Sequence, residues 1–339
     1  MGREALVTGG AGFIGSNLVA DLAERGQRVI VYDNLSRKGT AMNLEWLRDT
    51  CGDRIEFIEA DVCDFTSLRR AVSRASVIYH LAAQVAVTTS VADPRSDFQV
   101  NALGAFNLLE AARLGGNKPI LVFTSTNKVY GCMEDLRVEE DETRYRFAGQ
   151  GDGVSEQRPL DFHSPYGCSK GAADQYVRDY ARIYGLPTVV FRMSCIYGPR
   201  QFGNEDQGWV AHFLISGMKG RPLTVYGNGK QVRDILWVGD LVRAFHAAVG
   251  RIETVRGSVY NIGGGKENTL SLLELLELMR SRYGYRAAPS FADWRPGDQP
   301  IYVSDIRKAK EELGWEPAVG SNEGIDMLYR WIQTHEKMF

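Results

Sequence analysis

A glycine-rich loop close to the start of the chain restricts the fold more than any other feature. The apolar residues 5–8 predict a short buried strand, and three glycines at three-residue intervals follow it, before a helix that runs to about Glu24. Glycines at this spacing let the backbone approach a pyrophosphate, whose charge then lies at the N-terminus of the helix. We therefore expect this loop to bind a dinucleotide. Its residues are Gly9, Gly12, Phe13, Ile14 and Gly15.

The acidic end of the next predicted strand restricts the choice of dinucleotide. Residues 28–32 predict a strand that leads directly into Asp33. A carboxylate there can accept hydrogen bonds from both ribose hydroxyls of NAD and would repel the 2′-phosphate of NADP. Arg37 and Lys38 follow the strand and offer charges that suit NADP, but Asp33 stands closer to the expected ribose. We therefore predict NAD as the cofactor, with Asn34 also in contact with it.

Alternating strands and helices continue through the first half of the chain. Strands are expected at 55–58, 77–80 and 120–123, and helices at 65–72 and 98–113. This alternation predicts an α/β fold with a doubly wound parallel sheet of the Rossmann type. Ligands of such folds lie at the carboxyl ends of the strands. The further residues that we expect beside the cofactor are Asp61, Val62, Leu81, Ala82, Ala83, Gln84 and Thr124.

A tyrosine and a lysine four residues apart provide candidate chemistry. Pro165 suits a first helical turn and residues 166–184 have helical periodicity, so Tyr166 and Lys170 share one face. A free tyrosine has a pKa of about 10, which a nearby ammonium and an oxidised nicotinamide would lower. Taken alone, this spacing also occurs by chance on protein surfaces. Because the glycine loop precedes it, we predict Thr126, Tyr166 and Lys170 as catalytic residues, with Tyr166 and Lys170 also contacting the cofactor.

Composition argues against several classes of partner. Forty basic and 42 acidic residues nearly cancel, so no overall field attracts nucleic acid or a membrane surface. The five cysteines lack CxxC spacing and the five histidines are scattered, which favours a reducing compartment and no metal site. The first residues lead straight into a strand, and the longest uncharged stretch, 75–92, contains polar side chains. We expect a cytoplasmic protein.

The motifs, in this order, resemble those of the extended short-chain dehydrogenase/reductases that modify nucleotide sugars. The resemblance runs through the whole chain, including residues 233–236 and 295–298. Longer strings are similar, more narrowly, to 2-epimerases of CDP-linked sugars. This likeness implies an NAD-dependent isomerase that inverts carbon 2 of a CDP-linked hexose through a transient 2-keto intermediate. The strings lie at 34–39, 125–131, 161–176 and 206–210.

Two positions depart from patterns in the superfamily. The related 4,6-dehydratases have Asp-Glu directly after the catalytic threonine, whereas this chain has Asn127 and Lys128. An amide and an ammonium cannot replace that acid and that base, so dehydration is disfavoured. Galactose 4-epimerases have an asparagine where this chain has Cys195, so that substrate contact is not transferred. A nucleotide-sugar 4-epimerase, a reductase, a dehydratase and a non-catalytic dinucleotide sensor remain alternatives.

The carboxyl-terminal part is expected to form a smaller α/β unit that holds a nucleotide-diphosphate sugar, with a CDP-sugar favoured. Two guanidinium groups in this part suit a pyrophosphate. The predicted division is a cofactor-binding unit of residues 1–192 plus 234–262 and a sugar-binding unit of residues 193–233 plus 263–339. The residues predicted to contact the substrate are Thr126, Asn127, Lys128, His163, Arg233 and Arg295.

Two further expectations concern a loop and the assembly. Residues 133–162 are charged and too long for a tight connection, so we expect them to form a loop that covers the substrate. The family resemblance implies a homodimer or homotetramer in which helices near 98–113 and 166–184 meet their counterparts.

Overall fold

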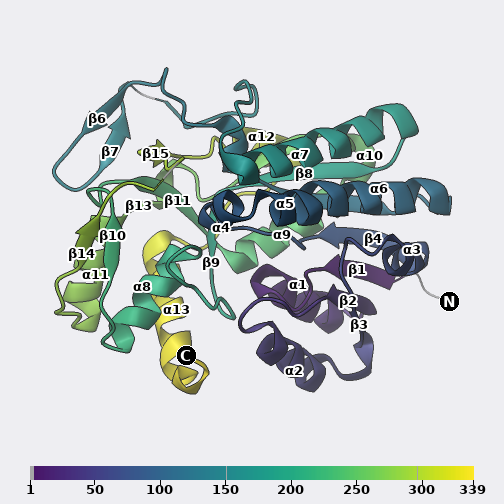
Figure 1. Ribbon diagram of the computed structural model, residues 1–339, viewed down its shortest axis with the longest axis horizontal. Helices are drawn as coiled ribbons and strands as arrows, with labels where there is room; N and C mark the ends of the chain where they lie inside the picture. Colours follow the sequence, from purple (N-terminus) through teal and green to yellow (C-terminus); the bar gives the residue numbers. More distant parts are fainter. Residues whose placement is uncertain (1–3, 150, 296) are drawn as a thin grey trace.

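The largest element of the computed structural model is a sheet of seven parallel strands (Figure 1). The structure describes residues 4–149, 151–295 and 297–339; residues 1–3 and Pro296, which enter the sequence arguments above, lie outside the described part. The strands are β1 (Glu4–Thr8), β2 (Val29–Asp33), β3 (Ile55–Glu59), β4 (Ala75–His80), β5 (Ile120–Thr126), β8 (Thr188–Met193) and β12 (Val259–Ile262). Their order across the sheet is β12-β8-β5-β4-β1-β2-β3, with every neighbouring pair parallel.

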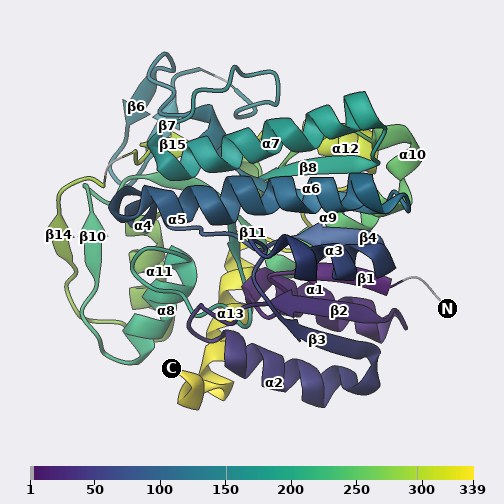
Figure 2. The same ribbon diagram turned by 45° about the vertical axis from the view of Figure 1, so that its right-hand side comes forward.

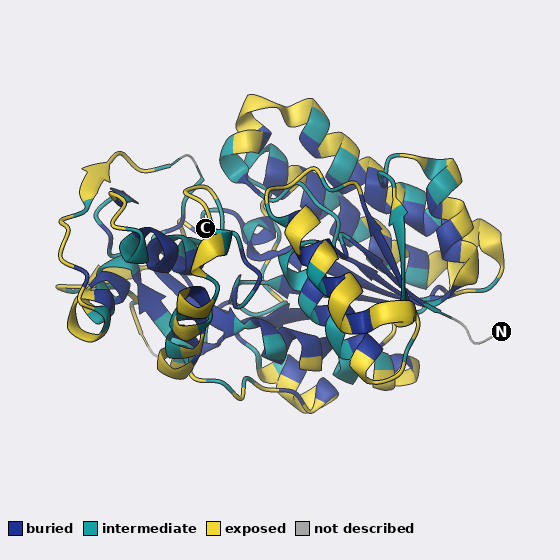
Figure 3. Cartoon of the chain, turned by 90° about the horizontal axis from the view of Figure 1, so that it is seen from below, coloured by how far each residue is buried: buried dark blue, intermediate teal, exposed yellow. Residues whose placement is uncertain are grey.

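Helices cover both faces of this sheet, because successive residues of each strand point to opposite sides. One face is covered by α1 (Phe13–Glu24), α2 (Thr40–Cys51), α9 (Val238–Gly250), α10 (Ile252–Val255) and α12 (Arg307–Leu313), and the other by α3 (Phe65–Arg74), α6 (Gly104–Gly115) and α7 (Ser164–Tyr184). Val7 and Val31 pack in the first core, whereas Leu6 and Ile30 pack in the second. Figure 3 shows buried strands between helices whose outer surfaces are exposed. The predicted doubly wound α/β fold is confirmed.

Helix α7 carries the tyrosine and the lysine that share one face. Pro165 lies in its first turn, where the missing N–H removes no intrahelical hydrogen bond. The helix ends at Gly185, whose φ of 65° suits a residue without a side chain. Tyr166 and Lys170 are both on the buried side of the helix. Figures 1 and 2 show α6 and α7 side by side along the outside of the molecule.

A smaller sheet lies beside the carboxyl ends of the large one. Its strands are β9 (Cys195–Tyr197), β11 (Val232–Trp237), β13 (Thr269–Ser271) and β15 (Ile301–Tyr302). Strand β11 is central, pairing with the other three. The helices around it are α8 (Trp209–Met218), α11 (Leu272–Tyr283) and α13 (Ser321–Thr334), and a parallel pair, β10 (Thr224–Tyr226) and β14 (Ser290–Ala292), lies at its margin.

The chain passes between the two sheets more than once. It leaves the large sheet after β8, forms β9 and β11, and returns to the large sheet as its edge strand β12. Residues 234–237, predicted to belong to the cofactor-binding unit, lie in β11 and pair within the smaller sheet. The following helix α9 packs in the core of the large sheet. The division into two units stays a prediction.

Residues 133–162 contain a short hairpin of β6 (Val138–Glu140) and β7 (Tyr145–Phe147). Tyr145 and Phe147 pack on Val232 and Ile301 of the smaller sheet. The remaining short helical segments are η1 (Gly52–Arg54), α4 (Val87–Ala92), α5 (Pro94–Phe98), the π-helical turn η2 (Gln99–Leu103), η3 (Asn127–Tyr130), η4 (Lys266–Asn268) and η5 (Glu336–Met338). Within the described residues, no helix is both long and apolar enough to cross a membrane.

Candidate active site

The glycine loop between β1 and α1 has the shape that a dinucleotide requires. Gly9 has a φ of 70°, and a Cβ atom there would lie 2.7 Å from the backbone nitrogen of Ala82. A Cβ atom on Gly15 would collide with the carbonyl oxygen of Gly9. Gly12 precedes α1 and has no side chain to cap it, so the first N–H groups of the helix are open to an anion. The loop therefore fits the pyrophosphate of NAD.

Every residue predicted to contact the cofactor lines one cavity of about 510 Å³. Asp33 lies there at the end of β2, and its carboxylate accepts hydrogen bonds from the backbone N–H groups of Ala11 (3.0 Å) and Leu35 (2.9 Å). Burial raises the pKa of Asp33. Asn34 donates to Asp61 across 2.7 Å, which joins the ends of β2 and β3. The Oγ of Ser125 is buried without a partner among the described residues and lines the same cavity, which suits a bound polar ligand.

A second cavity of about 370 Å³ adjoins the first, between the large sheet and the smaller one. Its lining includes Thr126, Asn127 and Lys128 at the end of β5, as well as Arg233 and Arg295. All predicted substrate residues except His163 therefore come together here. No residue of 133–149 or 151–162 lines this cavity, so the expectation that this stretch covers the substrate is not met.

His163 is not among the residues that line either cavity. The Nε2 atom of its ring lies 3.0 Å from the carboxylate of Asp161, and its Nδ1 atom lies 3.0 Å from the Sγ of Cys132. It is the residue before α7. Its contact with the substrate stays a prediction from the family resemblance.

Tyr166 lines both cavities and is thus the point where they meet. Burial raises the pKa of Tyr166 to about 12, while a hydrogen bond with Thr126 lowers it. Among charged groups, Asp97 raises this pKa and Arg37 lowers it. The phenol is therefore protonated at neutral pH unless further positive charge comes close to it.

Lys170 lines the dinucleotide cavity, and its predicted effect on the Tyr166 phenol stays a prediction. It is almost fully buried, and its ammonium group lies 4.4 Å from the centroid of the Phe123 ring. Burial lowers the pKa of Lys170 to about 7, against the effect of the carboxylates of Asp174 and Asp97. A lysine with this pKa is only partly charged at neutral pH. Arg37, which the sequence suggested only for NADP, is a further cation that lowers the pKa of Tyr166.

A buried hydrogen-bond network holds α7 against the cofactor cavity. Asp97 is fully buried and accepts hydrogen bonds from Gln84 (2.8 Å), Asn101 (3.0 Å) and Ser169 (2.5 Å). Asn101 in turn accepts from the backbone N–H of Gln84. The network joins the cavity wall after β4 to the helix that carries Tyr166. It was not found from the sequence, because Asp97 and Asn101 lie in helical segments without a recognisable motif.

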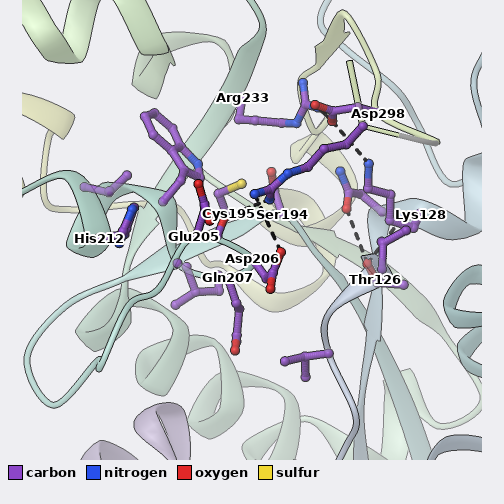
Figure 4. A pocket seen from close by; sticks show the side chains of 18 of the residues that line it. Thr126, Lys128, Ser194, Cys195, Glu205, Asp206, Gln207, His212, Arg233 and Asp298 are labelled. Atoms are coloured by element: carbon purple, nitrogen blue, oxygen red, sulfur yellow. Dashed lines mark hydrogen bonds and ion pairs between the residues drawn. The ribbon is translucent and has the colours of Figure 1, made fainter. Parts of the chain in front are cut away.

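Charged side chains line the second cavity (Figure 4). Arg233 forms an ion pair of 2.7 Å with Asp298, and the Lys128 ammonium lies 3.7 Å from the same carboxylate. Lys128 also donates to the backbone carbonyl of Gly297 at 3.1 Å. Burial lowers the pKa of Lys128. Asp298 is a site residue that the sequence analysis quoted in a motif without assigning it a role.

Arg295 also lines this cavity. Its guanidinium lies 3.8 Å from the centroid of the Tyr226 ring, and it donates to the backbone carbonyl of Glu205 at 2.7 Å. Its second nitrogen lies 3.6 Å from the carboxylate of Asp206. We call this cavity the cationic cavity after Lys128, Arg233 and Arg295, whose charges are matched in the lining by three carboxylates. Its guanidinium and ammonium groups are the ones that can bind an anionic ligand. Within residues 4–149, 151–295 and 297–339, no group of three histidine, cysteine or acidic side chains is placed to hold a metal ion.

The dinucleotide cavity, the adjoining cationic cavity and the tyrosine between them define an enzyme of the extended short-chain dehydrogenase/reductase class. The family model of GDP-mannose 4,6 dehydratase matches residues 6–328. The chain belongs to this family.

Similar proteins agree with the class. CDP-paratose 2-epimerase of Salmonella typhi is 43% identical over 336 residues, which cover 97% of this chain and 99% of that protein. This relative confirms the narrower likeness that the motifs indicate. The UDP-glucose 4-epimerase of Thermotoga maritima, solved with UDP-glucose, has a TM-score of 0.85 and 34% identity, covering 98% of this chain and 99% of that one. The dTDP-glucose 4,6-dehydratase of Streptomyces venezuelae has a TM-score of 0.86 and 29% identity, covering 99% and 98%. It was solved with NAD bound, in agreement with the predicted cofactor.

Proposed function

We propose that this protein is an NAD-dependent epimerase that inverts carbon 2 of a CDP-linked hexose. The substrate class is CDP-paratose, giving CDP-tyvelose, or a close analogue such as CDP-glucose. The proposal rests above all on the position of Tyr166, which faces the dinucleotide cavity on one side and the cationic cavity on the other. The likeness to CDP-paratose 2-epimerase over nearly the whole chain supports the choice of carbon and nucleotide.

The reaction needs a group that removes and returns one proton. The glycine loop and Asp33 would hold NAD, which would supply a hydride acceptor for the sugar carbon and positive charge that favours the phenolate. Tyr166, as phenolate, takes the proton of the sugar 2-hydroxyl, and the same residue returns it after the sugar has turned over. Thr126 donates a hydrogen bond to the oxygen that becomes the ketone. Because the pKa of Tyr166 is about 12, the positive charges of Arg37 and the cofactor are needed to form the phenolate.

The cationic cavity would hold the nucleotide diphosphate while the sugar moves. Arg233 and Arg295 offer forked donors to the pyrophosphate from two sides. Lys128 lies where the dehydratases have a carboxylate base, and its contacts with Asp298 and Gly297 keep an ammonium at that position. This arrangement supports a reaction that leaves every hydroxyl on the sugar.

A 4-epimerase of another nucleotide sugar is the second candidate. The observation that favours it is the structural likeness to the UDP-glucose 4-epimerase of Thermotoga maritima. Both reactions use the same proton-transfer groups, so the two candidates differ only in which sugar carbon lies beside Tyr166. Product analysis distinguishes them.

The test is to incubate the purified protein with a panel of CDP- and UDP-sugars without added cofactor and to identify the products by NMR. With deuterium on carbon 2 of the substrate, the product should keep the label, and loss of the label to solvent would rule out the mechanism. Tyr166→Phe should abolish turnover while the protein still holds NAD. Tyr176→Phe is the matched control, since Tyr176 lies on the exposed side of the same helix. Inversion at carbon 4 would favour the second candidate.

We also propose that a second copy of the chain binds the outer face of α6 and α7. These helices and the adjoining α5 expose large apolar side chains in the single chain, and such groups mark an interface. They are Phe98, Phe106, Leu114, Tyr176, Ile183 and Tyr184. Light scattering of the wild type and of Ile183→Asp tests the assembly, because the charge should shift it towards the monomer.

A cytoplasmic location accords with five cysteines that are all unpaired.

A further inference from the structure

The segment from Arg200 to Gly208, between β9 and α8, forms a wall that both cavities share. Gln201, Asp206 and Gln207 line the dinucleotide cavity and the cationic cavity alike. Figure 4 shows Asp206 and Gln207 beside the cationic cavity. Any movement of this segment would therefore change the space available to the cofactor and to the substrate together.

One end of the segment packs tightly on the loop and helix that follow β2. The Phe202 ring lies against Gly39, where an added Cβ atom would collide with the ring. The guanidinium of Arg200 lies 3.9 Å from the centroid of the Trp46 ring, and its backbone carbonyl accepts a hydrogen bond of 3.3 Å from Asn43. These contacts fix the segment beside the β2–α2 loop, which also carries Asp33 and Asn34 for the cofactor ribose.

The other end of the segment contacts Arg295, which lines the cationic cavity. Arg295 donates to the backbone carbonyl of Glu205 and lies beside Asp206. Between the two ends, the Arg37 guanidinium donates to the side-chain oxygen of Gln207. Arg37 comes from the β2–α2 loop and Gln207 from the segment, so this hydrogen bond joins opposite walls of the dinucleotide cavity. Arg37 is exposed, which places the bond at the solvent side of that cavity.

We propose that Arg37 and Gln207 form a clasp across the dinucleotide cavity that slows the release of bound NAD. Arg37 acts here as a positioning residue for the wall, through its hydrogen bond to Gln207. The clasp rests on the proposed function. An epimerase gains and loses no electrons overall, so the hydride must return to the sugar before the cofactor leaves the protein, and slow release of NAD serves this requirement.

The experiment measures the rate at which NAD leaves the purified holoenzyme after rapid dilution, by chromatography of the released dinucleotide. Arg37→Met and Gln207→Leu each remove one partner and keep the approximate size of the side chain. Each should raise the release rate roughly threefold to tenfold, the range that corresponds to the net contribution of one ordinary hydrogen bond. The double variant should release NAD no faster than either single variant, because both changes break the same bond.

Two further variants keep the result interpretable. Gln207→Glu retains an acceptor for Arg37 and should release NAD no faster than the wild type. Arg70→Met removes an exposed cation that lines neither cavity and should leave the rate unchanged. Unchanged release in both single variants would overturn the clasp. So would multiplicative effects in the double variant, or an equal acceleration in Arg70→Met, which would point to a general loss of charge. The assay needs no sugar, so its outcome is independent of which carbon the enzyme inverts.

Discussion

Replacing Lys170 with Met should stabilise the folded protein. The ammonium group is almost completely buried and lies 4.4 Å from the centroid of the Phe123 ring. Burial lowers the pKa of Lys170 from 10.5 to about 7. One pKa unit corresponds to about 1.4 kcal/mol, so charging this side chain in the folded protein costs on the order of 5 kcal/mol. The aromatic ring offsets part of this cost.

The pH dependence follows from the protons bound in each state. Between about pH 7 and pH 10.5 the unfolded chain keeps a proton on Lys170 that the folded protein has lost. The free energy of unfolding of the wild type therefore rises with pH across this window, at up to about 1.4 kcal/mol per pH unit. Below the window both states are protonated and the folded protein bears the full cost. The Met variant lacks this titration, so its advantage should be largest at about pH 6 and should shrink as the pH rises.

Urea denaturation of both proteins after removal of the dinucleotide, repeated at several pH values, measures this difference. Lys337→Met is the matched control, because Lys337 is exposed, and it should give no advantage at any pH. Equal stability of the wild type and Lys170→Met at about pH 6, or an advantage that does not change with pH, would contradict the burial argument.

Three further changes have expected outcomes. Asp174→Asn leaves the buried guanidinium of Arg192 without its carboxylate and should lower the free energy of unfolding by about 3–5 kcal/mol in urea denaturation. Lys128→Met removes one of the two cations beside Asp298 in the cationic cavity. In steady-state kinetics, the factor by which KM rises should be roughly ten times the factor by which kcat falls. Gly39→Ala places a methyl group against the Phe202 ring at a φ of 87°; it should accelerate NAD release and lower the melting temperature by calorimetry.

The large sheet was predictable from the sequence, but helix α2 was not. Each strand is a short apolar run, and helices separate the strands along the chain. In α2 the buried face includes the polar residues Thr40 and Asn43, so the apolar periodicity is weak. Asn43 is stabilised there because it donates to the carbonyl of Ala11, a contact between distant segments. The predicted helix at 98–113 contains a π-helical turn, which leaves no mark in the apolar pattern.

The lining of the dinucleotide cavity could be predicted because most of its predicted residues follow directly after a strand that the apolar pattern locates, whereas Tyr166 and Lys170 lie in α7. Parallel strands bring these ends to one edge of the sheet, so positions along the chain translate directly into one cavity. Gln207 and Asp298 were not assigned because they come from remote loops that meet the site only through the packing of the smaller sheet. The charge states were not predictable either, since the pKa values of Tyr166 and Lys170 depend on burial.

The late return of β12 to the edge of the large sheet has a practical consequence for anyone who wishes to divide the gene. A fragment that stops after β8 would leave that strand as an unprotected edge, with open N–H and C=O groups that invite aggregation. The complementary fragment would carry β12 without the neighbour to which it bonds. Split-protein reporters or separately expressed halves should therefore be cut at surface loops within one sheet and never at the passage from β8 to β9.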